Sequence, residues 1–267
     1  MSTITTLRRS FVSEWILLGR RRLWIGVSAT AIGLAAVITW LLVASSTTMG
    51  RGQTAVTLDS HAITGSGGAT AAAMPAMGFT ALLTVAAFAA AMGNDISRGT
   101  LRTAFLRQRS RAMLITGKLG ARIVMALTVL VAAMITAAVT TQMIALARGL
   151  DTSDWASTAA LGTTAENLLR LIVFVTMYAV IGTAVAVAIP STPIALGALL
   201  VWFGPVENII GDGRTWAQEW FPGLVLREVL APTPTGPSTT HVAIVLAAYA
   251  LVAIATITVL TRRDVTE

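Results

Sequence analysis

The sequence predicts an all-α integral membrane protein, on three observations. Of its 267 residues, 55% are hydrophobic and only 12% are charged, whereas soluble domains average about 25% charged residues. Apolar runs of the length that a transmembrane helix needs, about 20 residues, recur along the chain. The net charge of +7 gathers at the ends of these runs, where membrane topology explains it better than nucleic-acid binding does. The chain has no cysteine, which excludes disulfides, thiolate catalysis and cysteine-ligated metals.

An amphipathic helix is expected over residues 3–22, ahead of the first apolar run. Its apolar side chains recur at helical spacing: Ile4, Leu7, Phe11, Trp15 and Leu18. Polar side chains occupy much of the remaining surface: Arg8, Arg9, Ser10, Ser13 and Glu14. This pattern predicts a helix that lies in the cytoplasmic membrane interface. The alternative is a helix packed against the body of the protein itself.

Six apolar segments are expected to cross the membrane, so that residues 1–267 form one transmembrane domain. These segments are residues 23–44, 76–92, 118–147, 166–189, 194–210 and 241–260. The third is longer than a bilayer requires, which predicts that it tilts or projects into the cytoplasm. The fifth is expected to break near Gly204-Pro205, since these residues interrupt helices.

The connections between these segments differ in character. Residues 45–75 are rich in glycine, serine and threonine, which predicts a flexible external loop. Residues 211–240 contain Trp216 and Trp220 and are too apolar for a plain loop. We expect them to form short re-entrant helices at the outer interface, where aromatic side chains anchor. Glu166 and Arg170, four residues apart at the outer end of the fourth span, are expected to pair.

The basic residues predict the orientation of the spans. Most of them fall in the N-terminal helix, in residues 93–122 and beyond the last span. Basic loops stay in the cytoplasm, so both termini are expected there. The abundance of arginine and alanine beside a single lysine, Lys118, favours a bacterial cell membrane as the location.

Catalytic and cofactor-binding motifs are missing from the sequence. Gly117-Lys118 is followed by Leu119, where a phosphate-binding loop needs serine or threonine. His61 and His241 stand alone, and neither the H-E-x-x-H zinc motif nor a nucleophile elbow occurs. The chain is therefore expected to be no enzyme and to hold no metal or cofactor.

Few polar side chains lie within the apolar segments. A proton-coupled carrier needs a buried ionisable group in its path; the candidates, Glu166 and Glu207, lie near the outer ends of their spans. Gln142 and Asn208 are assigned to a translocation path, with a bond to another helix as the alternative for Gln142.

Residues 93–122 are the longest polar and basic stretch of the chain. Its basic residues are Arg98, Arg102, Arg107, Arg109, Arg111, Lys118 and Arg122. Ser97 can cap a short helix, on which Leu101, Ala104 and Phe105 form an apolar face. An amphipathic helix of this kind can seat that face in a groove of a soluble partner. The alternative is a loop whose arginines only set the topology and bind lipid headgroups.

This stretch resembles the signature region of ABC-2 type permeases, the membrane subunits of ATP-binding-cassette exporters. The family shows an acidic residue, a basic residue before Gly-Thr-Leu, a short helix, a Pro-x-Ser-Arg step and Gly-Lys opening the third span. The matching residues are Asp95, Arg98-Gly99-Thr100-Leu101, Ser110-Arg111 and Gly117-Lys118. Gln108 stands in place of the family's proline. Arg262-Arg263-Asp264 is similar to the family's usual ending.

The resemblance implies a cytoplasmic coupling helix within residues 93–117 that contacts a separate ATPase. The residues it assigns to this contact are Asp95, Arg98, Gly99, Thr100, Leu101, Arg102, Phe105, Ser110, Arg111 and Lys118. Two ATPase copies would bind ATP and magnesium, and a second permease subunit, identical or homologous, would complete the transporter in the lipid membrane. The implied activity is export of an amphipathic small molecule such as a drug, antibiotic or lipid, of the kind seen in multidrug resistance.

Two other functions are left open by the sequence. One is export of a polysaccharide or a lipid-linked glycan. The other is a membrane sensor or assembly factor without transport activity. Dependence of any activity on a separate ATPase distinguishes an exporter from a sensor.

Overall fold

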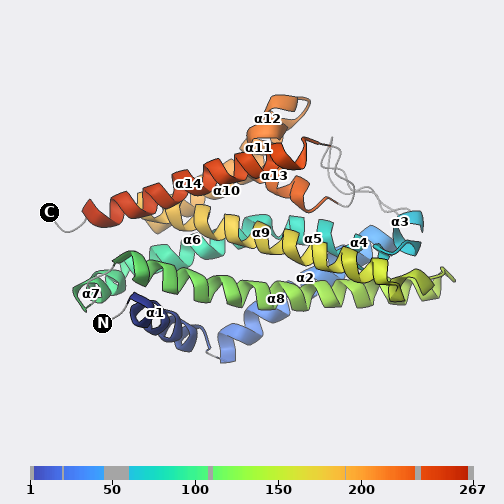
Figure 1. Ribbon diagram of the computed structural model, residues 1–267, viewed down its shortest axis with the longest axis horizontal. Helices are drawn as coiled ribbons and strands as arrows, with labels where there is room; N and C mark the ends of the chain where they lie inside the picture. The colour runs from blue at the N-terminus through green and yellow to red at the C-terminus, as the bar shows by residue number, and fades with distance from the viewer. Residues whose placement is uncertain are drawn as a thin grey trace.

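A computed structural model of the protein describes residues 3–19, 21–44, 60–107, 111–189, 191–231 and 236–263. The regular elements in these ranges are helices, and no strand occurs among them. Figure 1 shows a bundle whose long helices run roughly along one axis. The all-α prediction is thereby confirmed. The predictions for residues 45–59, Gln108, Arg109, Ser110 and Asp264 fall outside the described ranges.

Five helical segments of the described chain are long and apolar enough to cross a membrane. They are α2 (Arg21–Ala44), α8 (Arg111–Ala147), α9 (Thr158–Ala188), the run of α10, η3 and α11 (Thr192–Gly211), and α14 (Thr239–Arg263). A sixth crossing forms only if Gly68–Gly78 and Ala81–Ser97, bent by 53° relative to each other, act as one span. The chain is a membrane protein by these criteria, and its second predicted span is not one straight helix.

The bounds predicted for that second span, residues 76–92, are wrong. α5 (Ala73–Phe79) ends inside this segment, and α6 (Ala81–Ser97) begins there. The amide and the hydroxyl of Thr80 both donate to the Met77 carbonyl, at 3.0 and 2.7 Å, which closes α5 and lets the chain bend.

Helix also replaces part of the predicted external loop. α3 (Ser60–Thr64) and α4 (Gly68–Ala71) lie within residues 45–75, and both α4 and α5 pack on α8. Ala72, Ala73 and Met74 are buried there. Small and apolar side chains therefore make this segment part of the bundle.

Two long helices begin earlier than the apolar runs suggest. α8 begins at Arg111 rather than residue 118, so much of the predicted coupling loop is helical. α9 begins at Thr158 rather than residue 166, since the Ser157 hydroxyl accepts a hydrogen bond from the Ala160 amide at 3.1 Å and caps the helix. The predicted pair between Arg170 and Glu166 is confirmed, with a shortest separation of 2.5 Å.

The fifth segment does not break at Gly204-Pro205. α10 (Thr192–Val201) continues into η3 (Trp202–Val206), a π-helical turn, and then into α11 (Glu207–Gly211). The wider turn accommodates Pro205, which has no amide hydrogen to donate to the helix. The predicted short helices follow as α12 (Thr215–Trp220) and α13 (Pro222–Val229).

α9 lies at the centre of the bundle, in contact with α6, α8 and α14. Gly182 lets α6 approach, because a Cβ atom there would lie only 2.7 Å from the Val85 carbonyl oxygen. Phe174 and Tyr178 of α9 form edge-on aromatic contacts, and Tyr178 forms another with Phe203 of η3. The long helix α8 carries α1 (Thr3–Leu18) and α2 on its other side.

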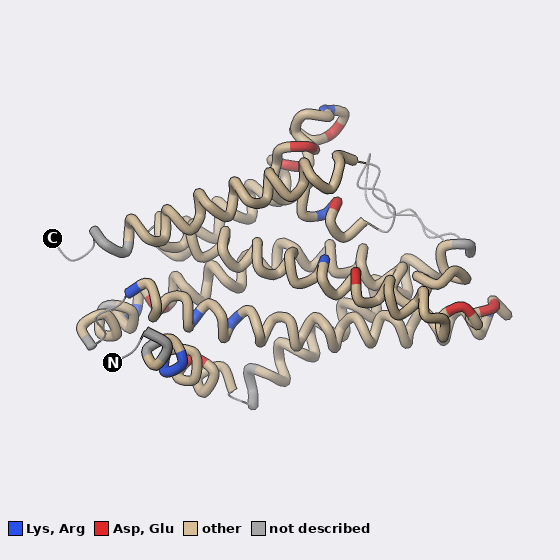
Figure 2. The backbone as a smooth tube through the Cα atoms, in the orientation of Figure 1, with Lys and Arg blue, Asp and Glu red and all other residues tan. Residues whose placement is uncertain are grey.

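The two ends of the bundle differ in charge. α1, α7 (Thr100–Arg107) and the last turns of α14 lie at one end, at the left of Figure 1. α3, α4 and η2 (Ser153–Ala156) lie at the other. Figure 2 shows lysine and arginine gathered near α1 and the start of α8, and acidic residues around η2.

Candidate functional site

The short helix α7 lies between α6 and α8 and is fixed to the end of α6. Gly99 adopts a φ of 67°, a left-handed conformation that ends a helix and that glycine adopts without strain. The Thr100 hydroxyl lies 3.0 Å from the Asp95 carbonyl oxygen and 3.2 Å from Asp95 Oδ1. Ser97 does not cap α7 as predicted, because it belongs to α6 and its hydroxyl donates to the Asn94 carbonyl.

The predicted docking face of α7 points into the protein. Leu101 is buried in the main core, and Ala104 and Phe105 pack against that core. The Arg111 guanidinium lies 5.2 Å from the centre of the Phe105 ring. Leu101 is therefore not free to enter a partner's groove, because the chain's own helices cover it, and Phe105 is partly covered.

The opposite face of α7 is exposed. Leu106 has 85% of its surface exposed, more than any other large hydrophobic side chain in the described chain. Thr100 and Thr103 of α7 are also exposed, as is Arg98 at the end of α6.

Beneath α7, four charged side chains from three helices meet. Glu14 comes from α1, Asp95 from α6, and Lys118 and Arg122 from α8. Lys118 Nζ lies 2.8 Å from Glu14 Oε2 and 2.9 Å from Asp95 Oδ2. Arg122 NH2 lies 2.5 Å from Glu14 Oε1 and 2.6 Å from Asp95 Oδ2. We call these four residues the charge cluster.

The charge cluster follows from helical spacing and from one glycine. Lys118 and Arg122 stand four residues apart, so they share a face of α8. Gly117 lets α1 lie directly on α8, since a Cβ atom there would be 2.6 Å from Ser10 Cβ and 2.9 Å from the Leu7 carbonyl oxygen. The Ser10 hydroxyl donates to the Leu114 carbonyl at 2.7 Å. One turn further along α1, Glu14 then reaches both cations.

The N-terminal helix packs on the body of the protein. α1 lies against α8, as the alternative expected, and it does so through the buried polar residues Ser10 and Glu14. Val12, Ile16 and Leu17 remain exposed on α1. Two residues of the polar side, Ser10 and Glu14, therefore face the protein, whereas Arg8, Arg9 and Ser13 are exposed.

Because the charge cluster is buried, its stability depends on all four charges being present. The side chains of Glu14 and Arg122 are 5% and 8% exposed. Two positive and two negative groups balance, but removing one partner from a buried ion pair leaves an uncompensated charge. The cluster thus locks the ends of α1, α6 and α8 to one another, and with them the base of α7.

Gly117→Ala is expected to destabilise the protein by about 2 kcal/mol, since an added methyl group would overpack the contact of α1 with α8. The melting temperature in detergent measures this effect. Gly120→Ala is the matched control, because its Cβ atom would lie 3.6 Å from the nearest atom, on the Phe11 ring, an ordinary contact. Equal melting temperatures for the two variants would contradict the close packing of α1 on α8.

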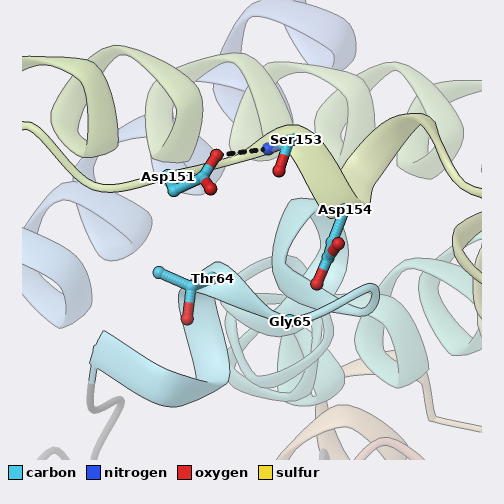
Figure 3. Close-up of a pocket in the computed structure, with 5 residues that line it drawn as sticks. All are labelled: Thr64, Gly65, Asp151, Ser153 and Asp154. Carbon is cyan, nitrogen blue, oxygen red and sulfur yellow. Dashed lines mark hydrogen bonds between the residues drawn. The ribbon is translucent and has the colours of Figure 1, made fainter.

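Two cavities open at the ends of the bundle. A groove of about 550 Å³ near α7 is lined by Asn94, Ser97, Ser191, Thr192, Pro193 and Leu196. A smaller polar pocket of about 310 Å³ lies at the opposite end, between the α3–α4 turn and η2 (Figure 3), and is lined by Thr64, Gly65, Asp151, Ser153 and Asp154. There the hydrogen bond from the Ser153 amide holds the pKa of Asp151 below its usual value.

The residues assigned to a translocation path lie in different places. Gln142 donates to the Thr152 hydroxyl at 3.3 Å, so it bonds the segment after α8 rather than another long helix. Asn208 accepts a hydrogen bond from Arg227 NH1 at 2.7 Å and donates to the Gly204 carbonyl. The described residues contain no group of three or more side chains that could hold a metal ion.

Glu14 and Arg122 were not among the predicted site residues. Arg122 could have been recognised from the sequence, because a charge within an apolar segment needs an oppositely charged partner there. The partners, however, come from residues 14 and 95, whose proximity depends on how α1 packs.

A comparison with known proteins identifies the family of this chain. A family model described as "Protein of unknown function (DUF2705)" matches residues 33–266. The chain belongs to the DUF2705 family. The match to DUF2705 begins within α2 and includes α7, Asp95, Lys118 and Arg122, whereas Glu14 precedes it. No curated protein matches the chain.

Proposed function

We propose that this DUF2705 protein is the permease subunit of an ATP-binding-cassette exporter. In this role it forms the path for an amphipathic small molecule, such as a drug, antibiotic or lipid, and a separate ATPase supplies the energy. The observation that carries the proposal is the attachment of α7. A short helix with an exposed face contacts α6 and α8, two of the three helices that the charge cluster holds together.

The attachment of α7 suits the transmission of force. A push on its exposed face reaches α6 through Gly99 and through the hydrogen bond from Thr100 to Asp95. Asp95 in turn contacts Lys118 and Arg122 of α8. α6 also packs closely on α9 along the bundle. Closure of two ATPase subunits would therefore tilt the helices that surround the path.

The contact surface assigned to the ATPase is the exposed face of α7, which includes Thr103 and Leu106, together with the exposed Arg98 at the end of α6. This replaces the apolar face of Leu101 and Phe105. The basic end of the bundle would face the cytoplasm of a bacterial cell, with both chain termini on that side. Two ATPase copies, which bind ATP and magnesium, and a second permease subunit would complete the transporter.

Co-purification tests the proposal. The chain is isolated from its native membranes in mild detergent, and the proteins that accompany it are identified by mass spectrometry. An ATPase subunit in comparable amount is the expected result, and a different permease beside it would indicate a heterodimer. Isolation of the chain without an ATPase in several detergents would contradict the exporter and favour a sensor or assembly factor.

A further inference from the structure

Glu207 is a carboxylic acid enclosed within the apolar part of the protein. It has no exposed surface and stands at the start of α11, directly after the π-helical turn η3. Ionisable side chains at such positions are rare and tend to be functional, because burying their charge is costly. Neither α7 nor the charge cluster involves this residue.

Glu207 holds the short helix α13 in place. Its Oε1 atom accepts hydrogen bonds from Trp202 Nε1 at 2.8 Å and from the Gly223 amide at 3.2 Å. Gly223 lies in the first turn of α13, whose N-cap residue, Phe221, offers no side-chain cap. The carboxyl group therefore supplies the acceptor that a helix N-terminus lacks. Gly223 permits this approach, since a Cβ atom there would clash with Glu207 Oε2.

The second carboxylate oxygen of Glu207, Oε2, has no hydrogen-bond partner among the described residues. Glu207 Oε2 is fully buried and accepts no hydrogen bond from any residue that the structure describes. The Leu224 amide faces the same carboxyl group. An ionised carboxylate would place negative charge on this oxygen, and a buried charge without a counter-ion costs several kcal/mol or more.

Among the described residues no cation forms an ion pair with Glu207. Arg227 of α13 is the cation whose charge acts on it, but Arg227 NH1 donates to Asn208 and NH2 to the Phe203 carbonyl. Tyr178 of α9 and Tyr249 of α14 face Glu207 from the other helices and carry no charge at neutral pH. Proton binding to Oε2 neutralises the group.

We propose that Glu207 is a proton-binding site whose occupancy keeps α13 docked. With the proton on Oε2, the neutral carboxyl group accepts at Oε1 and fits its apolar surroundings. Loss of that proton creates a charge that draws in water or Arg227. Arg227 would then leave Asn208 and Phe203, and α13 would move away from η3 and α11. The ligand of this site is a single proton, and the site does not depend on the proposed transport function.

Cysteine labelling of the purified chain tests this site, since the natural sequence has no cysteine. Leu226→Cys places a thiol on the buried face of α13, and Ala73→Cys places one at a buried position of α5. Dividing the labelling rate at position 226 by the rate at position 73 corrects for the pH dependence of the thiol itself. From mildly acidic to mildly alkaline pH this ratio is expected to rise by about tenfold, as linkage to one proton allows.

Glu207→Gln in both cysteine variants is the decisive comparison, because glutamine is similar in shape and cannot ionise. The ratio is expected to stay low at every pH in this background. A flat ratio in the chain that keeps Glu207, or an equal rise in the Glu207→Gln chain, would overturn the proposal. Infrared spectroscopy of the natural sequence provides a test without a variant: a protonated carboxyl band is expected at mildly acidic pH, and its absence would also overturn the proposal.

Discussion

Glu14→Gln is expected to lower the free energy of unfolding by about 3 kcal/mol, the loss typical of breaking a buried ion pair. The substitution removes one negative charge and leaves Lys118 and Arg122 with Asp95 alone. α1 should then separate from α8, because Glu14 and Ser10 are the buried polar residues that join the two helices. The shift of the melting temperature in detergent measures the loss.

An exposed ion pair provides the matched control for Glu14→Gln. Glu166→Gln removes the same charge from a pair with Arg170, but the Glu166 side chain is 59% exposed. Its expected effect is below about 1 kcal/mol, since solvent screens exposed pairs. A Glu14→Gln chain as stable as the Glu166→Gln chain would show that the charge cluster does not hold α1.

Leu106→Asp is expected to reduce binding of the ATPase by at least about tenfold, because central residues of a contact surface contribute more than about 1 kcal/mol each. The substitution places a charge at the most exposed apolar side chain of α7. The fold should be unaffected, since the side chain contributes little to the core. Quantitative co-purification from membranes measures the bound ATPase, and the melting temperature checks the fold.

Leu161→Asp is the matched control for this surface. Leu161 is 71% exposed in the first turn of α9, at the opposite end of the bundle. ATPase binding should be unchanged in this variant. Leu101→Asp should instead disrupt folding, because Leu101 lies in the main core. Normal ATPase binding to the Leu106→Asp chain would show that the exposed face of α7 does not contact the ATPase.

The sequence was sufficient to predict what depends on local composition. The long helices, the helical character of residues 3–18 and the pairing of Glu166 with Arg170 all follow from apolar length and helical spacing. The predicted first and last residues of the helices were less accurate. Thr80 and Ser157 change where helices end and begin through local hydrogen bonds, and such bonds leave little trace in hydropathy.

The sequence alone could not predict which way each helix face points. Residues 100–107 carry an apolar face that fits either a partner's groove or the chain's own core, and periodicity alone cannot distinguish the two. The contacts of Leu101 and Phe105 with the core decide this. The charge cluster was equally hidden, because it joins residues 14, 95, 118 and 122 through the close approach that Gly117 permits.

Site-specific cross-linking at position 106 tests the proposed function most directly. A photoreactive amino acid replaces Leu106, the chain is expressed in its native membranes, and the cross-linked products are identified by mass spectrometry. The expected product joins α7 to a soluble protein that carries a phosphate-binding loop, and the same probe at position 161 should not form it. Cross-links to lipid alone, or to proteins without a nucleotide-binding motif, would contradict a coupling role for α7.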